Sequence, residues 1–442
     1  MIVMKFGGSS VADADRIGRV TDLVRARLED RPVVVVSALK GVTYDLIALA
    51  HAALGGDDSG YERIRGRHLK VCGDLEVDPG VLTENLNELS VLTKGISLVR
   101  ELTPRTLDYI VSFGERLSAR LIAAAFSARG IEARALDAFE VGMLTDDNFG
   151  GAQPIPEAYA ELKRHIPAAG ALPVITGFIG KSRGGDLTTL GRNGSDFTAS
   201  IVGAALGAAE IQIWTDVDGV MTADPTVVPD AQPIERMTFQ EASELAYYGG
   251  RVLHPSTIAP AIEKNIPVRV LNTFRPGHPG TSVVSIDPGR PGGVRAVVHK
   301  KNQIIVNVST PRMLMGHGFL ARIFEIFARH RIVVNMVSTS EVSVSVTIDD
   351  PRRLEAASKE LTEFATVTAE RDRAIVCVVG EGMRTTRGIA AKVFEAVRAS
   401  GVTVLMISQG ASKINLAFVV ANDDAHAVVR ALHRTFFSER EG

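Results

Sequence analysis

A lysine followed by two glycines stands near the start of the chain and could carry phosphoryl-transfer chemistry. Residues 5–10 have the sequence Lys-Phe-Gly-Gly-Ser-Ser and follow a short apolar run. Glycines let backbone N–H groups approach phosphate oxygens closely, and a following helix adds the positive end of its dipole. Lys5 would then supply a point charge to a phosphoryl group in transfer. Because the lysine precedes the glycines this is not the Walker pattern, and a plain tight turn remains an alternative.

A second glycine-containing segment, Gly-Arg-Asn-Gly-Ser-Asp at residues 191–196, comes just before a predicted helix over 196–206. An arginine beside a helix N-terminus can hold a carboxylate or a phosphate. Asp196 could orient Lys5 or a metal–nucleotide complex. Aspartate and serine also cap helices routinely, so a capping role stays open and does not exclude the other.

Other candidate side chains stand at the ends of predicted elements. Glu115 begins a predicted helix over 115–129 and could hold a substrate ammonium, or it could be a solvated partner of the helix dipole. The hydroxyls of residues 37–43 follow a predicted parallel strand, where ligands bind in open α/β sheets, unless they only cap. Residues 214–219 run from a strand into a turn of the Asx type or a ligand loop. His254 precedes a proline, and we expect it to be structural.

Strands and helices alternate over the first 290 residues and must position these side chains. We expect strands at 2–6, 33–36, 172–176 and 210–215, with helices between them. The β-branched run at 33–36 is typical of a parallel strand buried on both faces. The alternation predicts an α/β fold, a three-layer αβα sandwich around a mostly parallel sheet. Residues 55–105 are more polar and predict a helical insertion over the site.

An internal repeat follows a segment rich in proline and glycine at 275–293. Gly318 matches Gly388 at an offset of 70, and Met336 matches Met406 at the same offset. The first copy predicts a strand at 304–308, a helix at 319–329 and strands at 332–338 and 343–348. We therefore expect two α+β (ferredoxin-like) units, each of which can pair its sheet with another. The predicted domains are 1–290, 291–370 and 371–442, and a strand near 294–300 is a candidate to complete the last one.

Composition argues against several classes of protein. The 442 residues include 49 lysines and arginines against 51 aspartates and glutamates, for a net charge of −2. This balance disfavours a nucleic-acid binder and a polybasic membrane anchor, so neither partner is expected. No apolar run reaches the roughly 18 residues of a spanning helix, and no signal peptide is evident, so we expect a cytoplasmic protein. Two cysteines cannot form a disulfide framework, and no spacing indicates a protein-bound metal.

Six motifs taken in order resemble those of the aspartate kinases, which belong to the amino-acid kinase superfamily. They begin at residues 5, 112, 177, 189, 214 and 252, and they are Lys-Phe-Gly-Gly-Ser-Ser-Val-Ala-Asp, Ser-Phe-Gly-Glu, Gly-Phe-Ile-Gly, Thr-Leu-Gly-Arg-Asn-Gly-Ser-Asp, Trp-Thr-Asp-Val and Val-Leu-His-Pro. The tail from residue 318 resembles the paired ACT regulatory domains of this family, especially those of the lysine-sensitive enzyme. The resemblance covers nearly the whole chain.

The resemblance implies a reaction in which the side-chain carboxylate of L-aspartate attacks the γ-phosphorus of ATP, with Mg²⁺ carried by the nucleotide. The product would be 4-phospho-L-aspartate, the entry to lysine, threonine and methionine synthesis. By motif match, Lys5 stabilises charge on the phosphoryl group and Asp196 organises the lysine. Arg192 pairs with the substrate α-carboxylate, and Glu115 takes its ammonium. A carboxylate nucleophile needs no general base, so positioning and charge neutralisation should suffice.

The other implied contacts fall into two sets. Those to aspartate are Thr43, Phe178, Asn193, Gly194 and Ser195. Those to the nucleotide, besides Lys5, are Phe6, Gly7, Gly8, Thr215, Asp216, Met221, Thr226 and Arg251. Three of these depart from the family pattern: Met221 replaces an aromatic residue, Thr226 an arginine and Arg251 a lysine. Because a guanidinium is not a point charge, these changes bear on ATP affinity or nucleotide choice.

The resemblance also implies an amino-acid effector site in the first ACT copy. Its expected contacts are Met313, Gly316, Gly318, Leu320, Val334, Asn335, Thr339, Ser340 and Glu341. In the lysine-sensitive relative an aspartate stands at position 335 and meets the effector ammonium. An amide brings no charge, and charge-assisted hydrogen bonds contribute roughly 1 kcal/mol more than neutral ones. We predict weakened or altered lysine sensing, with threonine or another amino acid as an alternative effector, and a homodimer or a dimer of dimers.

Two other functions remain open from the sequence. The same fold could phosphorylate another amino acid or use another nucleotide, because Glu115 with Arg192 suits any α-amino acid. Alternatively, the chain could be a pseudokinase that senses amino acids through its ACT repeat. A hydroxamate assay with ATP and aspartate separates the three functions.

Overall fold

The computed structural model describes residues 1–167, 170–250, 253–287, 293–314, 317–384, 386–410 and 414–438. Two positions predicted to bind ligands, Arg251 and Gly316, lie outside the described residues, as does the predicted domain boundary at 290/291. The chain forms two compact units. The first comprises Met1–Val220, Glu235–Phe239 and Val252–Ile286, and the second comprises Met221–Ile234, Gln240–Arg251 and Asp287–Gly442.

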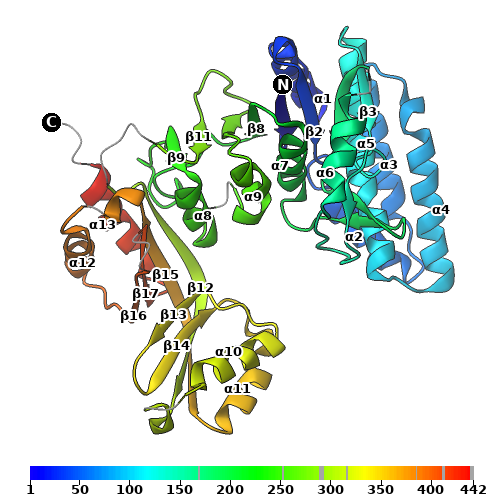
Figure 1. Cartoon of the computed structure of the whole chain (residues 1–442). Coiled ribbons are helices and arrows are strands. Elements are labelled where there is room, and N and C mark those ends of the chain that lie inside the picture. The colour runs from blue at the N-terminus through cyan, green and yellow to red at the C-terminus, as the bar shows by residue number, and fades with distance from the viewer. Residues whose placement is uncertain are drawn as a thin grey trace. The chain divides into compact units, whose positions relative to one another are not determined.

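An eight-stranded sheet organises the first unit, in the order β3-β5-β2-β1-β8-β10-β11-β9 (Figure 1). Its strands are β1 (Ile2–Phe6), β2 (Pro32–Val36), β3 (Ala133–Leu136), β5 (Leu172–Thr176), β8 (Glu210–Thr215), β9 (Arg236–Thr238), β10 (Val268–Asn272) and β11 (Thr281–Val284). The pairs from β3 to β10 are all parallel, and β11 joins β10 antiparallel. All five residues of β1 and of β2 are buried, as expected for strands covered on both faces.

Helices cover both faces of this sheet, and the predicted α/β class is confirmed. They are α1 (Ala14–Arg25), α2 (Val42–Ala53), α3 (Gly60–Leu75), α4 (Thr83–Val99), α5 (Pro104–Ala128), α6 (Glu157–His165), α7 (Gly194–Leu206) and α9 (Pro255–Glu263). A core of apolar side chains from β1 and β2 packs against α1 to α5. On the other face α7 contacts β1, β2 and β8. A small sheet of β4 (Leu144–Thr145), β6 (Ile179–Ser182) and β7 (Leu187–Thr189) completes the unit.

The predicted helix at 115–129 is wrong in its start. Helix α5 begins at Pro104, where the Thr103 side chain accepts a hydrogen bond from the Thr106 backbone N–H and caps the helix. Glu115 therefore lies in the middle of a buried helix, not in a solvated first turn. Gly114 inside this helix allows a close approach to Ala38, because a Cβ there would lie 2.8 Å from the Ala38 Cβ.

The segment 55–105 forms α3 and α4, as its helical character predicts. Figure 1 shows these helices beside α5, and both contribute buried residues to the same apolar core. The insertion is therefore an integral layer of the unit, packed against α2 and α5.

A six-stranded antiparallel sheet organises the second unit, in the order β13-β14-β12-β15-β17-β16. Its strands are β12 (Ala296–Ser309), β13 (Met336–Thr339), β14 (Ser343–Ile348), β15 (Thr366–Val379), β16 (Met406–Ser408) and β17 (Asn415–Ala421), and its helices are α10 (Phe319–Arg329), α11 (Leu354–Thr362), α12 (Ile389–Ala399) and α13 (Ala425–Phe437). The repeat is visible in matched positions: α10 and α12 follow glycines with positive φ, and β13 and β16 both begin at the repeated methionine.

Strand β12 takes part in both copies of the repeat. Its second half, Ile304 to Ser309, pairs with β14, whereas its first half, Ala296 to Lys300, pairs with the part of β15 that also pairs with β17. The register shifts between Lys300 and Gln303, where Asn302 has a φ of 60°. The assignment of 291–370 and 371–442 as separate domains stays a prediction.

Residues 221–234 pack on the second copy of the repeat. Thr222 accepts a hydrogen bond from the Val297 backbone N–H at 2.8 Å, and its hydroxyl lies 2.9 Å from His433 Nε2. Ala223 and Val228 join the core of β12, β15 and α13. No pattern in the sequence indicates that residues 221–234 pack on the second copy of the repeat, because the contacts join positions up to 211 residues apart.

Candidate active site

The carboxyl ends of the central parallel strands bring the candidate residues to one edge of the first unit. Strand β1 lies between β2 and β8, and Lys5 pairs in register with Val35 and Ile213. The chain leaves β1 toward β2 on one side and later returns to β8 on the other. Ligands in open α/β sheets bind at such a switch point, outside the carboxyl ends of the strands.

Lys5 forms a buried ion pair with Asp196. The two side chains are each 10% exposed, and Lys5 Nζ lies 2.5 Å from Asp196 Oδ1. Asp196 is the third residue of α7, so the positive end of this helix lies beside the pair. The arrangement places one ammonium at the carboxyl end of β1 and fixes its position from the helix.

The glycines after Lys5 let the backbone turn close to its neighbours. A Cβ on Gly8 would lie 2.8 Å from the Ala38 carbonyl oxygen, and a Cβ on Gly7 would lie 3.5 Å from Lys5 Nζ. The Gly7 N–H donates to the Trp214 carbonyl at 3.2 Å, and Phe6 stacks on the Trp214 ring. The close approach to Ala38 therefore requires a glycine at position 8, whereas a Cβ at position 7 would make only ordinary contacts.

Glu115 is a buried carboxyl with one free oxygen. Its Oε1 accepts a hydrogen bond from the Ala38 N–H at 3.0 Å, whereas Oε2 has no hydrogen-bond partner among the described residues. Burial raises the pKa of Glu115 to about 8, against the opposing effects of the Ala38 N–H and the charge of Lys5. A buried carboxyl with an unused acceptor suits a cationic group of a ligand.

Phe178 is held in the left-handed region, with φ 69°. Its N–H donates to the Thr198 hydroxyl at 2.9 Å, and its ring occupies the space where a Cβ of Gly194 would lie, at 2.6 Å. A Cβ on Gly177 would lie 2.6 Å from the Ser195 side chain. Backbone strain of this kind persists only where the surroundings enforce it, and it is concentrated at functional sites.

Arg192 is exposed and forms no ion pair with any residue that the structure describes. Asn193, with φ 56°, carries the chain from this arginine into α7, and both it and Arg192 face solvent while Gly194 and Ser195 are buried. Thr43 is half-buried in the first turn of α2. Arg192 thus precedes Asp196 by four residues. It lies on a loop that leads into α7, whose first turn is held by the ion pair between Asp196 and Lys5.

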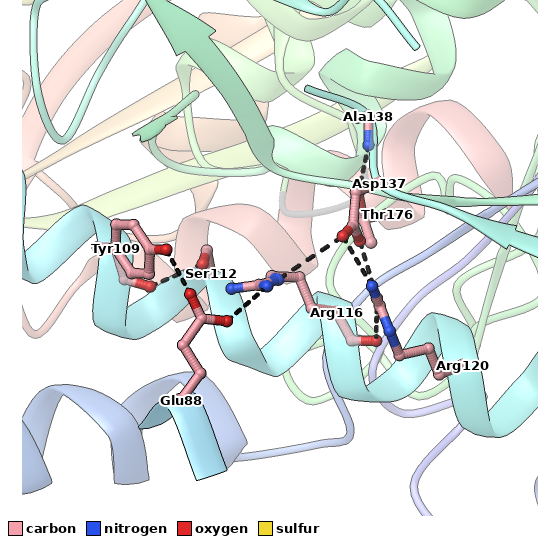
Figure 2. Close-up of polar contacts among 8 residues, drawn as sticks. All are labelled: Glu88, Tyr109, Ser112, Arg116, Arg120, Asp137, Ala138 and Thr176. Carbon is pink, nitrogen blue, oxygen red and sulfur yellow. Dashed lines mark hydrogen bonds and ion pairs between the residues drawn. The ribbon is translucent and has the colours of Figure 1, made fainter. Parts of the chain in front are cut away.

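A charge network that the sequence did not indicate surrounds the helix of Glu115. Arg116 Nη2 donates to Glu88 of α4 at 2.8 Å, and Glu88 also accepts from the Tyr109 hydroxyl at 2.5 Å (Figure 2). On the other side Arg120 binds Asp137, after β3, with two hydrogen bonds of 2.9 Å. The network joins α4, α5 and the end of β3, and so fixes α5 along its length. The residues that bond to one another are 17 to 28 positions apart in the sequence, and such separations do not form a recognisable sequence motif.

Asp108 is another residue that sequence reasoning missed. It lies one helical turn before Ser112 of the motif, and it is 3% exposed. Its carboxylate accepts hydrogen bonds from the Thr189 N–H and hydroxyl and from the Gly150 N–H. The one available signal is that Asp108 lies near the N-terminus of α5, and the sequence analysis did not identify that N-terminus.

The residues expected at the nucleotide belong to both units. Thr215 ends β8 and donates to Asp216, which is exposed, at 3.3 Å. In the second unit Met221 pairs with Pro233, and the exposed Thr226 donates from its N–H and its hydroxyl to Asp224. Their contacts to a nucleotide stay a prediction.

A cavity of about 490 Å³ lies in the second unit, at the start of α10. Six of the nine residues predicted to bind an effector line it, together with His317, Phe319 and Ala321; the six are Met313, Gly318, Leu320, Thr339, Ser340 and Glu341. Gly318, Phe319 and Leu320 at the N-terminal end of α10 line the cavity together with the acidic residue Glu341. The positive end of the helix dipole and a side chain of opposite sign thus border the same cavity, as an amino acid requires.

Asn335 is engaged elsewhere. Its Nδ2 donates to Gln303 at 2.7 Å, and its Oδ1 accepts from Lys300 Nζ at 3.3 Å. Lys300 also pairs with Asp349 at 2.7 Å. The Lys300 ammonium therefore already contacts the side chain at position 335.

Over the described ranges, no helix is long and apolar enough to cross a membrane. Within the same residues, histidine, cysteine, aspartate and glutamate side chains form no group of three or more that could hold a metal ion.

Comparisons with known proteins agree with this architecture. Residues 1–272 match the model of the amino acid kinase family, and residues 306–363 and 376–436 match an ACT domain model. Aspartokinase 1, chloroplastic, of Arabidopsis thaliana is 42% identical, over 98% of this chain and 80% of the plant protein. The lysine-sensitive aspartokinase 3 of Escherichia coli is 37% identical, over 99% of each chain. A crystal structure of E. coli aspartokinase III with aspartate and ADP superimposes with a TM-score of 0.85 at 35% identity, covering 99% of this chain and 100% of that one.

Proposed function

The chain belongs to the aspartokinases of the amino acid kinase family, and from this membership we propose that it transfers the γ-phosphoryl group of ATP to the side-chain carboxylate of L-aspartate. The product is 4-phospho-L-aspartate. The observation that carries the proposal is the buried pair of Lys5 and Asp196 at the carboxyl end of β1, beside Glu115. The solved relative with aspartate and ADP supports the same pair of ligands here.

The buried lysine performs the electrostatic part of the reaction. The transferring phosphoryl group spreads negative charge over its oxygens, and a preorganised ammonium in a poorly hydrated site stabilises that charge. Asp196 holds Lys5 Nζ in place through the buried ion pair, and the glycine turn lets phosphate oxygens approach. The aspartate side chain attacks as the carboxylate, so no residue has to remove a proton.

Glu115 and Arg192 bind the α-amino acid part of the substrate. The free Oε2 of Glu115 accepts the substrate ammonium, and that positive charge favours the ionised carboxylate. The guanidinium of Arg192, which forms no ion pair with the described residues, binds the α-carboxylate with its planar fork. The strained Phe178 backbone, with Gly177 and Gly194, shapes the wall between them.

Mg²⁺ is expected to arrive with the nucleotide. Asp196 and Glu115 are carboxyl groups near Lys5, and a magnesium ion that is bound by one or two carboxylates takes its remaining ligands from the phosphates and from water. When bound, the ion neutralises charge on the β- and γ-phosphates. Whether Met221 and Thr226 alter the choice of nucleotide is decided by comparing ATP with GTP as donor.

A hydroxamate assay with ATP and L-aspartate tests the proposal, because hydroxylamine traps the acyl phosphate. We expect turnover with aspartate and at least about a hundredfold loss of kcat in Lys5→Met. Turnover with glutamate but not with aspartate would instead assign another acceptor. Absence of turnover with any amino acid, in a protein that binds amino acids at its ACT repeat, would assign a sensor without kinase activity.

The ACT repeat is proposed to bind an amino-acid effector in the cavity at α10. One relative is named for its lysine sensitivity, and the cavity retains six of the expected contacts. Because Asn335 brings no charge and already binds Lys300, we expect weaker lysine binding than in an enzyme with aspartate there. Isothermal titration with lysine, threonine and methionine identifies the effector.

Two further properties complete the proposal. We expect a homodimer, or a dimer of dimers, formed through the ACT repeat, and sedimentation with and without the effector measures it. The cytoplasmic location stays a prediction, and the name of the plant relative places that protein in the chloroplast.

A further inference from the structure

Asp108 accepts three hydrogen bonds from two segments that are distant in sequence, the loop at Gly150 and the end of β7, where the loop to Arg192 begins. The donors are the Gly150 N–H at 2.9 Å, the Thr189 N–H at 2.8 Å and the Thr189 hydroxyl at 2.9 Å. The donors stand 42 and 81 residues from Asp108, so the carboxylate does not cap its own helix. With 3% of its surface exposed, Asp108 is a buried junction between α5 and these loops.

Both loops lead to the arginine that is proposed to bind the substrate. Thr189 ends β7, three residues before Arg192. Gly150 packs against Gly191, since a Cβ on Gly191 would lie 3.1 Å from the Gly150 carbonyl oxygen. Asp108 therefore holds the backbone before Arg192 by a direct bond and through the neighbouring loop.

The same helix carries the group proposed to bind the substrate ammonium. Glu115 follows Asp108 by seven residues, so the two lie on one side of α5, about 10 Å apart along its axis. Helix α5 is itself fixed by the Arg116 network. One rigid helix thus presents Glu115 and anchors the loop of Arg192.

We propose that Asp108 is a positioning residue that sets the separation between Glu115 and Arg192, and thereby the selection of α-amino acids. The ammonium and carboxylate of such a substrate are attached to one carbon, so their receptors must be held at one distance. The inference rests on the proposed function, because it assigns Arg192 to the α-carboxylate.

A double-mutant cycle tests this role. We expect Asp108→Asn to lower kcat/KM for aspartate about tenfold through KM, because a small misplacement of Arg192 weakens only the aspartate contact. KM for ATP should change less than about twofold. In the Arg192→Ala background, Asp108→Asn should cause little further loss, because the group that it positions is gone.

The matched control is Thr188→Val. Thr188 is the neighbour of Thr189 on β7, and its buried hydroxyl bonds Thr145 at 2.7 Å on the opposite side of the strand. This variant should lose thermal stability without raising KM for aspartate. If Asp108→Asn does not fold, Thr189→Val, which removes one of the three donors, is judged by the same criteria.

The outcomes separate the two proposals. Equal losses from Asp108→Asn in both Arg192 backgrounds, or parallel increases in both KM values, would overturn the positioning role. A wild-type protein without aspartate turnover would instead contradict the proposed function. Wild-type turnover with an unchanged KM in a folded Asp108→Asn variant would contradict the present inference alone.

Discussion

The Ala38 N–H donates to Glu115 Oε1 at 3.0 Å and joins the end of β2 to the middle of α5. The contact requires Gly114, because the helix approaches the turn after β2 too closely for a Cβ. The second carboxyl oxygen of Glu115 is buried and has no hydrogen-bond partner in the part of the chain that the structure describes. Binding capacity is thus obtained at a cost in stability, since burial disfavours the ionised form.

The substitution Glu115→Gln should stabilise the protein while removing activity. The pKa of Glu115 is about 8 in the folded chain against an ordinary value of 4.5. The folded state therefore holds this proton more tightly, and the contribution of Glu115 to the free energy of unfolding falls as the pH rises from 4.5 to 8. Glutamine has no such dependence. Calorimetry should show similar Tm values for the two proteins near pH 4.5. Near pH 8 the Tm of the variant should exceed that of the wild type by on the order of 5 °C.

Aspartate binding by the wild-type protein should strengthen with pH. Below a pKa of about 8 the Glu115 carboxyl is mostly protonated and cannot take an ammonium by charge pairing. We expect KM for aspartate to fall about tenfold or more between about pH 6 and about pH 8, while KM for ATP stays level. A pH profile that is the same in Glu115→Gln would contradict the assignment of this dependence to Glu115.

Breaking the pair of Lys5 and Asp196 should affect stability as well as catalysis. In Lys5→Met the Asp196 carboxylate stays buried without its partner, a situation that costs about 3–5 kcal/mol. The double variant Lys5→Met/Asp196→Asn should recover much of that stability but none of the activity. Chemical denaturation with the hydroxamate assay checks both expectations. Equal stability of the single and double variants would show that the two groups are not coupled.

The space at Gly194 should not accept a methyl group. In Gly194→Ala the new Cβ would lie 2.6 Å from a Phe178 ring carbon and 3.1 Å from its Cα, so the start of α7 must shift away from Lys5. We expect a loss of kcat of about a hundredfold. Gly73 in α3 is a matched control: a Cβ there meets nothing within 4 Å, so Gly73→Ala should raise stability by about 1 kcal/mol and leave kcat unchanged.

Lysine binding at the ACT repeat should depend on Lys300. In Asn335→Asp the new carboxylate would pair with the Lys300 ammonium, which already lies at the amide oxygen. We expect tighter lysine binding only when Asn335→Asp is combined with Lys300→Met, because the carboxylate is then free for an external ammonium. Titration calorimetry of the two single variants and the double variant measures this. Equal tightening in Asn335→Asp alone would exclude the internal ammonium as a competitor.

Local patterns in the sequence predicted much of the fold, but they did not predict the residues that hold the site residues in position. Apolar runs of neighbouring residues identified the central strands. Several matched residue pairs with the same offset of 70 identified the repeat. The predicted start of α5 is wrong, because residues 55–105 were assigned to a separate insertion, whereas the helix begins at Pro104 after the Thr103 cap. Motif match identified Lys5, Asp196 and Glu115 as a set. Asp108 escaped, since contacts across 42 and 81 residues leave no local pattern.

The shared strand β12 has a mechanical consequence for sensing. One uninterrupted stretch of backbone hydrogen-bonds within both copies of the repeat, and β15 runs beside it in the opposite direction. Neither half can slide along its sheet without pulling the covalent chain of the other half. A ligand that shifts Ile304–Ser309 against β14 would therefore also act on Ala296–Lys300 through the same strand, and cutting the chain between the two halves would remove that link.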